Sequence, residues 1–531
     1  MGIPLTIGNW ILALLPIAAL FCGILVLKWS TFKTGGIAWL FTAALAFFCF
    51  KMDIPGMLYA NSKGLSLSLY VLLIIWTAVF LYNVANRAGA IRVIGDTMTR
   101  LTNDSVLQCL LLAWCFTSLL QGLAGFGVPI AVVAPIMVSM GFEPLVAVAA
   151  CLVGHSWAIS FGSMGSSYNT IQLVTKIPGE VIGPAMALLF ILPIFVTGLS
   201  VLHIHSGFAG VKKGILPVIL AGVFISAALW GMNMLGMAQL ASLMAAACGS
   251  VILIIYARAK AGRRLNEAGP GAQPAGPDKS SGSPAADTAP TMSFITAAMP
   301  YIILIGISIV TQIPAIKDSC AGLVSGLNYP ETVTGLGYVS PEAKMYSQIK
   351  WASHPAPALF ISAVAGFFIY RRKTGVSVSI LADAAMDTVK KIVPTSVGIA
   401  TMVMMALVMS DAGMTNLLAR GIAVCLGGFF PLASPLIGVL GSFLTGSNTN
   451  SNVMFGLLQI ETAAAIGKSP VWLAAAQSVG GSLGVSIAPS TVMMGSANVG
   501  LAGQESSVMA KTLKYCLINA AALAVLVFIV S

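Results

Sequence analysis

The chain has 531 residues, of which 58% are hydrophobic and only 8% are charged. A soluble globular protein carries about 25% charged residues, so this composition excludes a soluble enzyme, a coiled coil and a disordered protein. The formal net charge of +11 fits Lys and Arg gathered in cytoplasmic loops, and no nucleic-acid partner is expected. The sequence therefore predicts an all-α polytopic membrane protein in contact with lipid, with about 12–14 membrane segments of roughly 20 residues.

Apolar runs of membrane-spanning character succeed one another along the chain. Ten of them are continuous and lie near 8–28, 36–51, 65–86, 181–202, 214–232, 237–257, 293–315, 355–371, 391–410 and 508–530. Two longer runs, 105–170 and 430–500, are interrupted by polar residues. Residues 259–292 are rich in Pro, Gly, Ala and Ser, a composition that cannot bury a core. We expect a disordered linker there.

Basic residues predict the orientation of the spans, because Lys and Arg gather on the cytoplasmic side of a membrane. They cluster after the first and third runs and around the later ones: Lys28, Lys33, Arg87, Arg92, Arg100, Lys212, Lys213, Arg258, Lys260, Arg371 and Arg372. Placing these residues in the cytoplasm puts the N-terminus outside and the linker 259–292 inside. Lys390 and Lys391 then mark the cytoplasmic start of the span 391–410.

Two parts of the chain are similar to each other. Residues 144–164 align without gaps with residues 470–490 at an offset of 326, and a second block aligns at an offset of 324, where Ala88-Gly89 matches Ala412-Gly413. In the predicted orientation these two Ala-Gly turns lie on opposite sides of the membrane. This arrangement indicates two inverted-topology repeats, which are typical of secondary transporters. The alternative is that any two membrane helices rich in Gly, Ala and Ser look alike.

Each repeat interrupts its apolar run at the same place. The first break reads QGLAGFGVP over 121–129, and the second reads TGSNTNSN over 445–452. Polar side chains and freed backbone groups persist at membrane depth only inside protein or beside a water-filled cavity, and the N-termini of broken helices favour anions. An ordinary loop outside the membrane is the alternative. The candidate binding residues from the two breaks are Gln121, Gly122, Gly125, Gly127, Thr445, Gly446, Ser447, Asn448, Thr449 and Asn450.

The segments that follow the breaks supply further candidates. Spacings of four place two serines on one helical face in each copy, and one more serine follows in each copy: Ser156, Ser160, Ser163, Ser482, Ser486 and Ser490. Close helix packing is the alternative role for such small residues. His155 lies in mid-span, where an ionisable residue is a functional candidate. Since imidazole titrates near physiological pH, His155 is the candidate for proton coupling, and a neutral structural His is the alternative.

Metal, cofactor and enzyme chemistry find little support. The nine Cys residues are scattered without a CxxC pattern, and no carboxylate pair or His/Cys cluster falls in a span, so neither a metal nor a cofactor is expected. Residues 480–484 (GGSLG) fit the pattern G-x-S-x-G. An intramembrane serine hydrolase that uses Ser482 with His155 as its base is therefore a remote alternative.

Several motifs resemble the L-lactate permease family. They are QGLAGFGVP (121–129), GFEPL (141–145) and FGSMG (161–165) in the first half, and FLTGSNTNSN (443–452), IAPS (487–490) and NVGLAGQES (498–506) in the second. The resemblance implies a permease of the bacterial inner membrane that takes up lactate and glycolate by proton symport. Similarity to the wider ion-transporter superfamily implies re-entrant hairpins and an elevator-like transport domain.

The resemblance and the repeats together divide the chain into seven parts. Repeat 1 has scaffold helices over 1–104 and a broken-helix transport segment over 105–180. Additional membrane helices cover 181–258, and the disordered cytoplasmic linker covers 259–292. Repeat 2 has scaffold helices over 293–429 and its transport segment over 430–505, before a C-terminal membrane helix over 506–531.

Three positions depart from the family pattern: Gln121, Asn448 and Val485 stand where the pattern has Glu, Asp and Lys. Because a carboxylate is the usual proton relay in a transporter, His155 becomes the substitute candidate for proton coupling. The leading hypothesis is a secondary transporter for small hydroxy-monocarboxylates such as L-lactate and glycolate. The second hypothesis is a transporter for another organic anion, a sulfonate or a dicarboxylate, with different coupling. Oligomeric state is left open.

Overall fold

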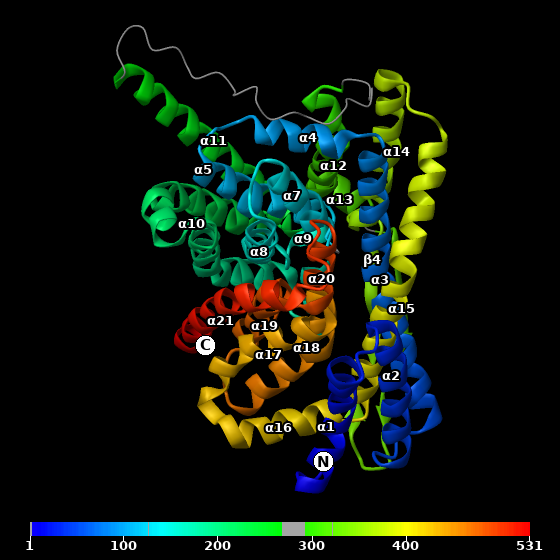
Figure 1. Cartoon of the computed structure of the whole chain (residues 1–531). Coiled ribbons are helices and arrows are strands. Elements are labelled where there is room, and N and C mark those ends of the chain that lie inside the picture. Colours follow the sequence, from blue (N-terminus) through cyan, green and yellow to red (C-terminus); the bar gives the residue numbers. More distant parts are fainter. Residues whose placement is uncertain (1–2, 126, 268–291, 321) are drawn as a thin grey trace.

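The computed structural model describes residues 3–125, 127–267, 292–320 and 322–531, most of which are helical (Figure 1). Ten helices in this part of the chain are long and apolar enough to cross a membrane, or up to twelve when each of two bent helix pairs counts as a span. The protein is therefore a polytopic membrane protein, with 10 to 12 candidate spans where about 12–14 were predicted.

Two long helices, α3 (Ile54–Arg87) and α15 (Ser379–Asp411), stand side by side over most of the height of the molecule (Figure 1). Four polar side-chain contacts join them in antiparallel order: Arg87–Asp387 (2.6 Å), Asn83–Thr388 (2.9 Å), Trp76–Ser396 (3.0 Å) and Lys63–Asp411 (2.8 Å). Apolar side chains fill the space between these contacts. The pair forms a frame against which the other helices pack.

Each long helix ends in the same way. After α3, Gly89 has a φ of 80° and its N–H donates to the carbonyl of Asn86, and after α15, Gly413 has a φ of 81° and its N–H donates to the carbonyl of Ser410. Glycine adopts this left-handed conformation without a steric penalty. Short amphipathic helices follow, α4 (Ala90–Thr99) and α16 (Met414–Leu426). They lie at opposite ends of the molecule (Figure 1).

Shorter elements flank the long pair: α1 (Ile7–Phe21), α2 (Thr31–Phe48), α12 (Phe294–Gln312), α13 (Pro314–Ser319) and α14 (Pro355–Thr374). Between α13 and α14 the chain forms two antiparallel two-stranded sheets, β1 (Val324–Tyr329) with β4 (Ala343–Lys350) and β2 (Thr332–Val333) with β3 (Val339–Ser340). The prediction of an all-α protein was wrong here. β-branched and aromatic residues between Gly and Pro turns favour short strands.

The second part of the structure is a compact helical bundle, which is built from segments of both halves of the sequence. It contains α5 (Ser105–Cys109), a π-helical segment (Leu110–Phe116), α6 (Thr117–Leu123), α7 (Val128–Ser139), α8 (Pro144–Gly154), α9 (Gly162–Thr175), α17 (Phe430–Thr445), α18 (Asn448–Ala465), α19 (Pro470–Gly484) and α20 (Pro489–Ala497). Two pairs are bent, Pro144–Ala158 with Gly162–Thr175 by 50° and Pro470–Ile487 with Pro489–Ala497 by 41°.

Three further helices cover this bundle: α10 (Gly179–Met234), α11 (Ala241–Glu267) and α21 (Glu505–Val530). The backbone of α10 leaves the helical region at Ser206 and Gly207, and its two legs pack together where Gly198 meets Val218. α10 thus contains the two spans predicted over 181–202 and 214–232. α11 extends to Glu267, past the predicted start of the linker, because residues 257–267 are mostly good helix formers. Residues 268–291 of the predicted linker lie outside the described residues.

The buried ion pair between Lys63 and Asp411 yields a prediction about stability. Their side chains are 4% and 8% exposed, and Ser340 donates to the second carboxylate oxygen at 2.9 Å. Asp411→Ala leaves the Lys63 ammonium buried without its partner, a change that costs about 3–5 kcal/mol. We expect a clear fall in the unfolding temperature of the purified protein in detergent.

Two control variants test the origin of that loss. The double variant Lys63→Met/Asp411→Leu removes both charges and should recover most of the stability. Arg87→Ala breaks a more exposed pair, whose loss should lower the stability much less because solvent screens the charges. Equal losses in Asp411→Ala and Arg87→Ala would contradict a special contribution of the buried pair.

Candidate functional site

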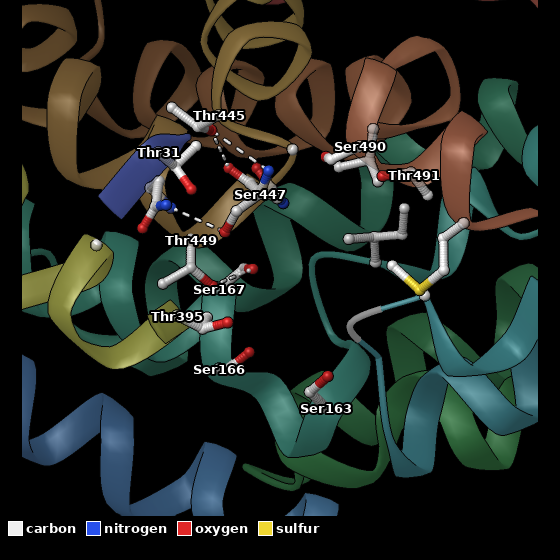
Figure 2. A pocket seen from close by; sticks show the side chains of 18 of the residues that line it. Thr31, Ser163, Ser166, Ser167, Thr395, Thr445, Ser447, Thr449, Ser490 and Thr491 are labelled. Carbon is white, nitrogen blue, oxygen red and sulfur yellow. Dashed lines mark hydrogen bonds between the residues drawn. The ribbon is translucent and has the colours of Figure 1, made fainter. Parts of the chain in front are cut away.

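A cavity of about 470 Å³ lies where the two polar breaks meet (Figure 2). Hydroxyl groups point into it from several helices, as Figure 2 shows for Thr31, Ser163, Ser167, Ser447 and Thr491. Of the candidate residues, the cavity is lined by Gln121, Gly127, His155, Ser163, Thr445, Gly446, Ser447, Asn448, Thr449, Asn450 and Ser490. Segments that are more than 300 residues apart in sequence therefore share one polar cavity.

The second break is a sharp turn between α17 and α18. Gly446 has a φ of 68°, and Ser447 then caps α18 by accepting a hydrogen bond from the N–H of Asn450 (3.3 Å). The N–H groups of Asn448 and Thr449 are at the start of α18, where no intrahelical acceptor exists. This end of α18 faces the cavity with the positive end of its dipole, which suits an anion.

The first break offers fewer donors than the second. Gly127 has a φ of 78° before α7 begins. The N–H of Val128 is already bonded to the carbonyl of Gly125 (3.2 Å), and Pro129 has no N–H. The N–H of Gly125 donates to the hydroxyl of Ser163 (2.8 Å), so Gly125 lies behind the cavity lining. The expectation of two similar anion-binding helix ends therefore fits α18 better than α7.

A left-handed turn at the start of α9 shapes the first half of the site. Ser163, Met164 and Gly165 have φ values of 48°, 54° and 73°. Left-handed backbone costs about 1–2 kcal/mol for each residue with a side chain, and such strain gathers at functional sites. The turn brings the Ser163 hydroxyl to Gly125 and leaves Ser166 and Ser167 on the cavity lining.

Hydrogen bonds at the cavity join residues from the first and the second half of the chain. Asn448 Nδ2 donates to Ser160 Oγ (2.9 Å), Asn452 Nδ2 donates to the carbonyl of Ser167 (3.0 Å), and the hydroxyls of Ser167 and Thr449 are 3.0 Å apart. Nearly all of these side chains are fully buried. The second break is thus held in place by residues from the first half of the chain.

Six predicted residues do not line the cavity: Gly122, Gly125, Ser156, Ser160, Ser482 and Ser486. Gly122 packs against the backbone of Leu243. The hydroxyls of the four serines donate to backbone carbonyls at 2.5–2.9 Å. These four serines contribute to helix packing, the alternative that the sequence left open.

His155 lines the cavity and is 2% exposed. Its Nδ1 lies 2.6 Å from the carbonyl of Cys151. A carbonyl only accepts hydrogen bonds, so Nδ1 carries the proton and Nε2 is left for exchange or substrate contact. The Ser482 hydroxyl donates to the carbonyl of Ser156 rather than to His155. The serine–base contact required by the hydrolase hypothesis is therefore replaced by a structural hydrogen bond.

Sequence reasoning missed the part of the cavity that α2 and α15 supply: Ser30, Thr31, Phe32, Lys391, Pro394, Thr395 and Gly398. It placed Lys391 at the cytoplasmic end of a span beginning at 391, whereas α15 begins at Ser379. Lys391, Thr395 and Gly398 are spaced by four and three residues, which puts them on one helical face. This spacing was the feature of the sequence that could have indicated a shared cavity-facing surface.

Further lining residues come from the bundle: Ile159, Ser166, Ser167, Val485, Thr491 and Met494. All three positions that depart from the family pattern line the cavity. They are Gln121, Asn448 and Val485. Within the described ranges, no group of three His, Cys, Asp or Glu residues is arranged to hold a metal ion.

A multi-pass helical protein whose broken helices meet at one polar cavity has the architecture of a membrane transporter. The sequence profile of L-lactate permease matches residues 9–531, and the chain belongs to the L-lactate permease family. It is 30% identical to an L-lactate permease of Bacillus subtilis, covering 96% of this chain and 94% of the relative. It is 29% identical to a glycolate permease of Escherichia coli, with coverages of 97% and 94%.

Among solved structures, the chain is similar to the YdaH transporter of Alcanivorax borkumensis. The TM-score is 0.50, the sequence identity is 15%, and the match covers 93% of this chain and 98% of the other. At this identity the similarity concerns the fold alone.

The turn at Gly446 yields a prediction about the site. A side chain at Gly446 would adopt φ > 0 and would also collide with the Ser490 hydroxyl. Gly467 also has a positive φ of 67°, but nothing lies within 4 Å of its added carbon. We expect Gly467→Ala to cost about 1 kcal/mol and Gly446→Ala to cost more, measured as unfolding temperatures in detergent. Adding Ser490→Ala should recover part of the Gly446→Ala loss, and no recovery would argue against the collision.

Proposed function

We propose that the protein is a secondary transporter for small hydroxy-monocarboxylates such as L-lactate and glycolate, and that the cavity between the two breaks is its substrate site. The observation that carries this proposal is the meeting of both breaks at one cavity lined by hydroxyl and amide groups. The names of the relatives, L-lactate permease and glycolate permease, support the substrate class.

The chemistry of the cavity suits a hydroxy acid. The carboxylate of such a substrate would accept hydrogen bonds from the first N–H groups of α18 and from the hydroxyls of Ser447 and Thr449. Asn450 Oδ1 is buried without a hydrogen-bond partner among the described residues. An unpaired buried acceptor costs about 1–3 kcal/mol, and the hydroxyl of lactate or glycolate could donate to it.

We infer that the two halves are inverted-topology repeats. The similar turns at Gly89 and Gly413 support this inference, because their hydrogen bonds match at an offset of 324. Close helix contacts support it as well: Gly154 packs on the carbonyl of Ala113, and Gly480 packs on that of Pro435. α4 and α16, which follow the two turns, lie at opposite ends (Figure 1).

The transport mechanism that we propose is elevator-like. Residues 105–180 and 430–505 would move together as the transport domain, since hydrogen bonds such as Asn448–Ser160 join them. Residues 1–104 and 293–429, which include the pair α3 and α15, would form the scaffold. The additional membrane helices predicted over 181–258 and 506–531 would be α10, α11 and α21.

The orientation proposed here follows from the basic residues. The N-terminus would be outside, and the linker 259–292 would be in the cytoplasm. The family implies the inner membrane of a bacterium.

Proton coupling through His155 is a further part of the proposal. Among the described lining residues there is no Asp or Glu, so a carboxylate relay is replaced by the free Nε2 of His155. A proton taken up at this atom would accompany the substrate anion.

A second candidate function is transport of another organic anion, a sulfonate or a dicarboxylate. It is favoured by the neutral residues Gln121, Asn448 and Val485 on the cavity lining. A thermal-shift screen of organic acids distinguishes the two, because a ligand that binds only the folded protein raises its stability.

Asn448 provides the first test of the site. Asn448→Ala removes the hydrogen bond that holds the start of α18 to Ser160. We expect at least a tenfold loss of L-lactate uptake into proteoliposomes under an imposed pH gradient, without loss of folded protein. Asn86→Ala changes an exposed amide outside the cavity and should transport normally. Unchanged uptake by Asn448→Ala would remove this residue from the site.

His155 provides the test of coupling. His155→Gln keeps a polar side chain but cannot titrate, so we expect L-lactate uptake that no longer responds to a pH gradient, while lactate exchange across the membrane persists. His205→Gln, which changes a histidine outside the cavity lining, is the matched control. If gradient-driven uptake by His155→Gln equals that of the unaltered protein, protons are coupled elsewhere.

A further inference from the structure

Lys391 stands out because it is a half-buried cation on the cavity lining. Among the described lining residues it is the one Lys, Arg, Asp or Glu. We propose that Lys391 pairs with the carboxylate of the substrate and, as the single fixed charge at the site, restricts the site to monovalent anions. This inference rests on the transport function proposed above.

Two other lysines that are sheltered from solvent, Lys63 and Lys260, have acidic partners. Lys63 lies 2.8 Å from Asp411, and Lys260 lies 2.7 Å from Asp104. Lys391 makes no ion pair and no side-chain hydrogen bond with the described residues. A sheltered charge without a partner is unfavourable, so an anion entering the cavity would supply what the protein itself supplies for the other two lysines.

The surroundings of Lys391 reinforce its positive potential. α2 and α18 both begin at the cavity, behind the capping residues Ser30 and Ser447. The positive ends of two helix dipoles therefore share the space with the ammonium group. No carboxylate on the described lining offsets them. Three sources of positive potential converge on one small polar cavity.

The number of charges explains the selectivity. While His155 is neutral, a monocarboxylate and Lys391 together leave the cavity electrically neutral. A dicarboxylate brings one more negative charge, which has no fixed cation to pair with and must lose hydration. A neutral analogue such as lactamide gains nothing from the ammonium. The preferred substrate is therefore a small monovalent anion, and dicarboxylates are disfavoured by their charge.

The position of Lys391 in the fold also matters for transport. It belongs to α15, whereas Ser447 and Asn450 belong to the turn that begins α18. An anion bound by both groups would link the long helix pair to the bundle. The carboxylate of the substrate would then connect the long helix pair to the bundle in this conformation, and this connection would break when the bundle moves.

The experiment compares ligands and variants in one assay. Stabilisation of purified protein by L-lactate, lactamide, methanesulfonate and L-malate is measured for the unaltered chain and for Lys391→Gln, Lys391→Arg and Lys390→Gln. We expect lactate to stabilise the unaltered chain, Lys391→Gln to weaken lactate binding at least tenfold, and Lys391→Arg to keep most of it. Lys390 is exposed and off the cavity lining, so Lys390→Gln is the matched control and should bind normally.

A gain of charge gives a second measurement that does not depend on the loss of Lys391. Thr395 lies one helical turn after Lys391 on the cavity lining. Thr395→Lys adds a second cation and should raise the affinity for L-malate relative to L-lactate at least tenfold. If Lys391→Gln fails to fold, Thr395→Lys and Lys391→Arg decide the question.

The outcomes separate the two proposals. Undiminished lactate binding by Lys391→Gln, or an unchanged malate-to-lactate ratio in Thr395→Lys, overturns the inference about Lys391 and leaves the transport function standing. Stabilisation by methanesulfonate but not by lactate, abolished in Lys391→Gln, overturns the substrate assignment and supports Lys391 as the anion partner.

Discussion

The structure depends on one constraint: a helix that breaks at membrane depth must find partners for its polar groups inside the protein. The two breaks meet this requirement largely through each other. Asn448 and Thr449 of the second half of the chain bond to Ser160 and Ser167 of the first half, and Asn452 donates to the backbone carbonyl of Ser167. At the cavity the two breaks no longer supply hydrogen-bond partners for each other. The N–H donors at the start of α18 have no protein acceptor there. The same polar groups thus hold the fold together on one side and face the cavity on the other.

The partners of the serines explain why small polar residues serve two purposes in this protein. Four serines donate to backbone carbonyls of their own or neighbouring segments: Ser156, Ser160, Ser482 and Ser486. They therefore supply hydrogen-bond donors for backbone carbonyls where the helices bend. Ser163 and Ser490 lie on the cavity instead. A sequence shows all six as equivalent, because residue type and helical spacing do not reveal which acceptor lies nearby. Only the packing of the neighbouring segment distinguishes a structural serine from one that faces the cavity.

Sequence patterns predicted the parts of the fold that depend on local composition. Apolar runs located the spans, the internal sequence similarity located the matching turns at Gly89 and Gly413, and the polar breaks located eight of the 24 residues that line the cavity. The patterns failed where tertiary contacts decide. The left-handed turn at Ser163 and Met164 has no compositional signal, since neither residue favours that backbone. The beginning of α15 was missed because its first twelve residues, Ser379 to Lys390, are too polar for an apolar run, although they continue the helix without a break.

Lys391 changes the meaning of the three neutral positions. Gln121, Asn448 and Val485 all line the cavity, and by themselves they would leave a site without any fixed charge. A neutral site offers an anion only hydrogen bonds, worth about 1.5–3 kcal/mol each to a charged group, and helix dipoles, worth about 0.3–1 kcal/mol each near a surface. Lys391 restores a full charge from a different element, so the site need not carry its cation where the family pattern has one. Because no carboxylate on the described lining pairs with Lys391, its ammonium stays available to an anion, and a proton relay at the cavity has to involve a group other than Asp or Glu. Under the two proposals, the charge that binds the anion and the site of proton exchange would belong to two different residues, Lys391 on the long helix and His155 in the bundle.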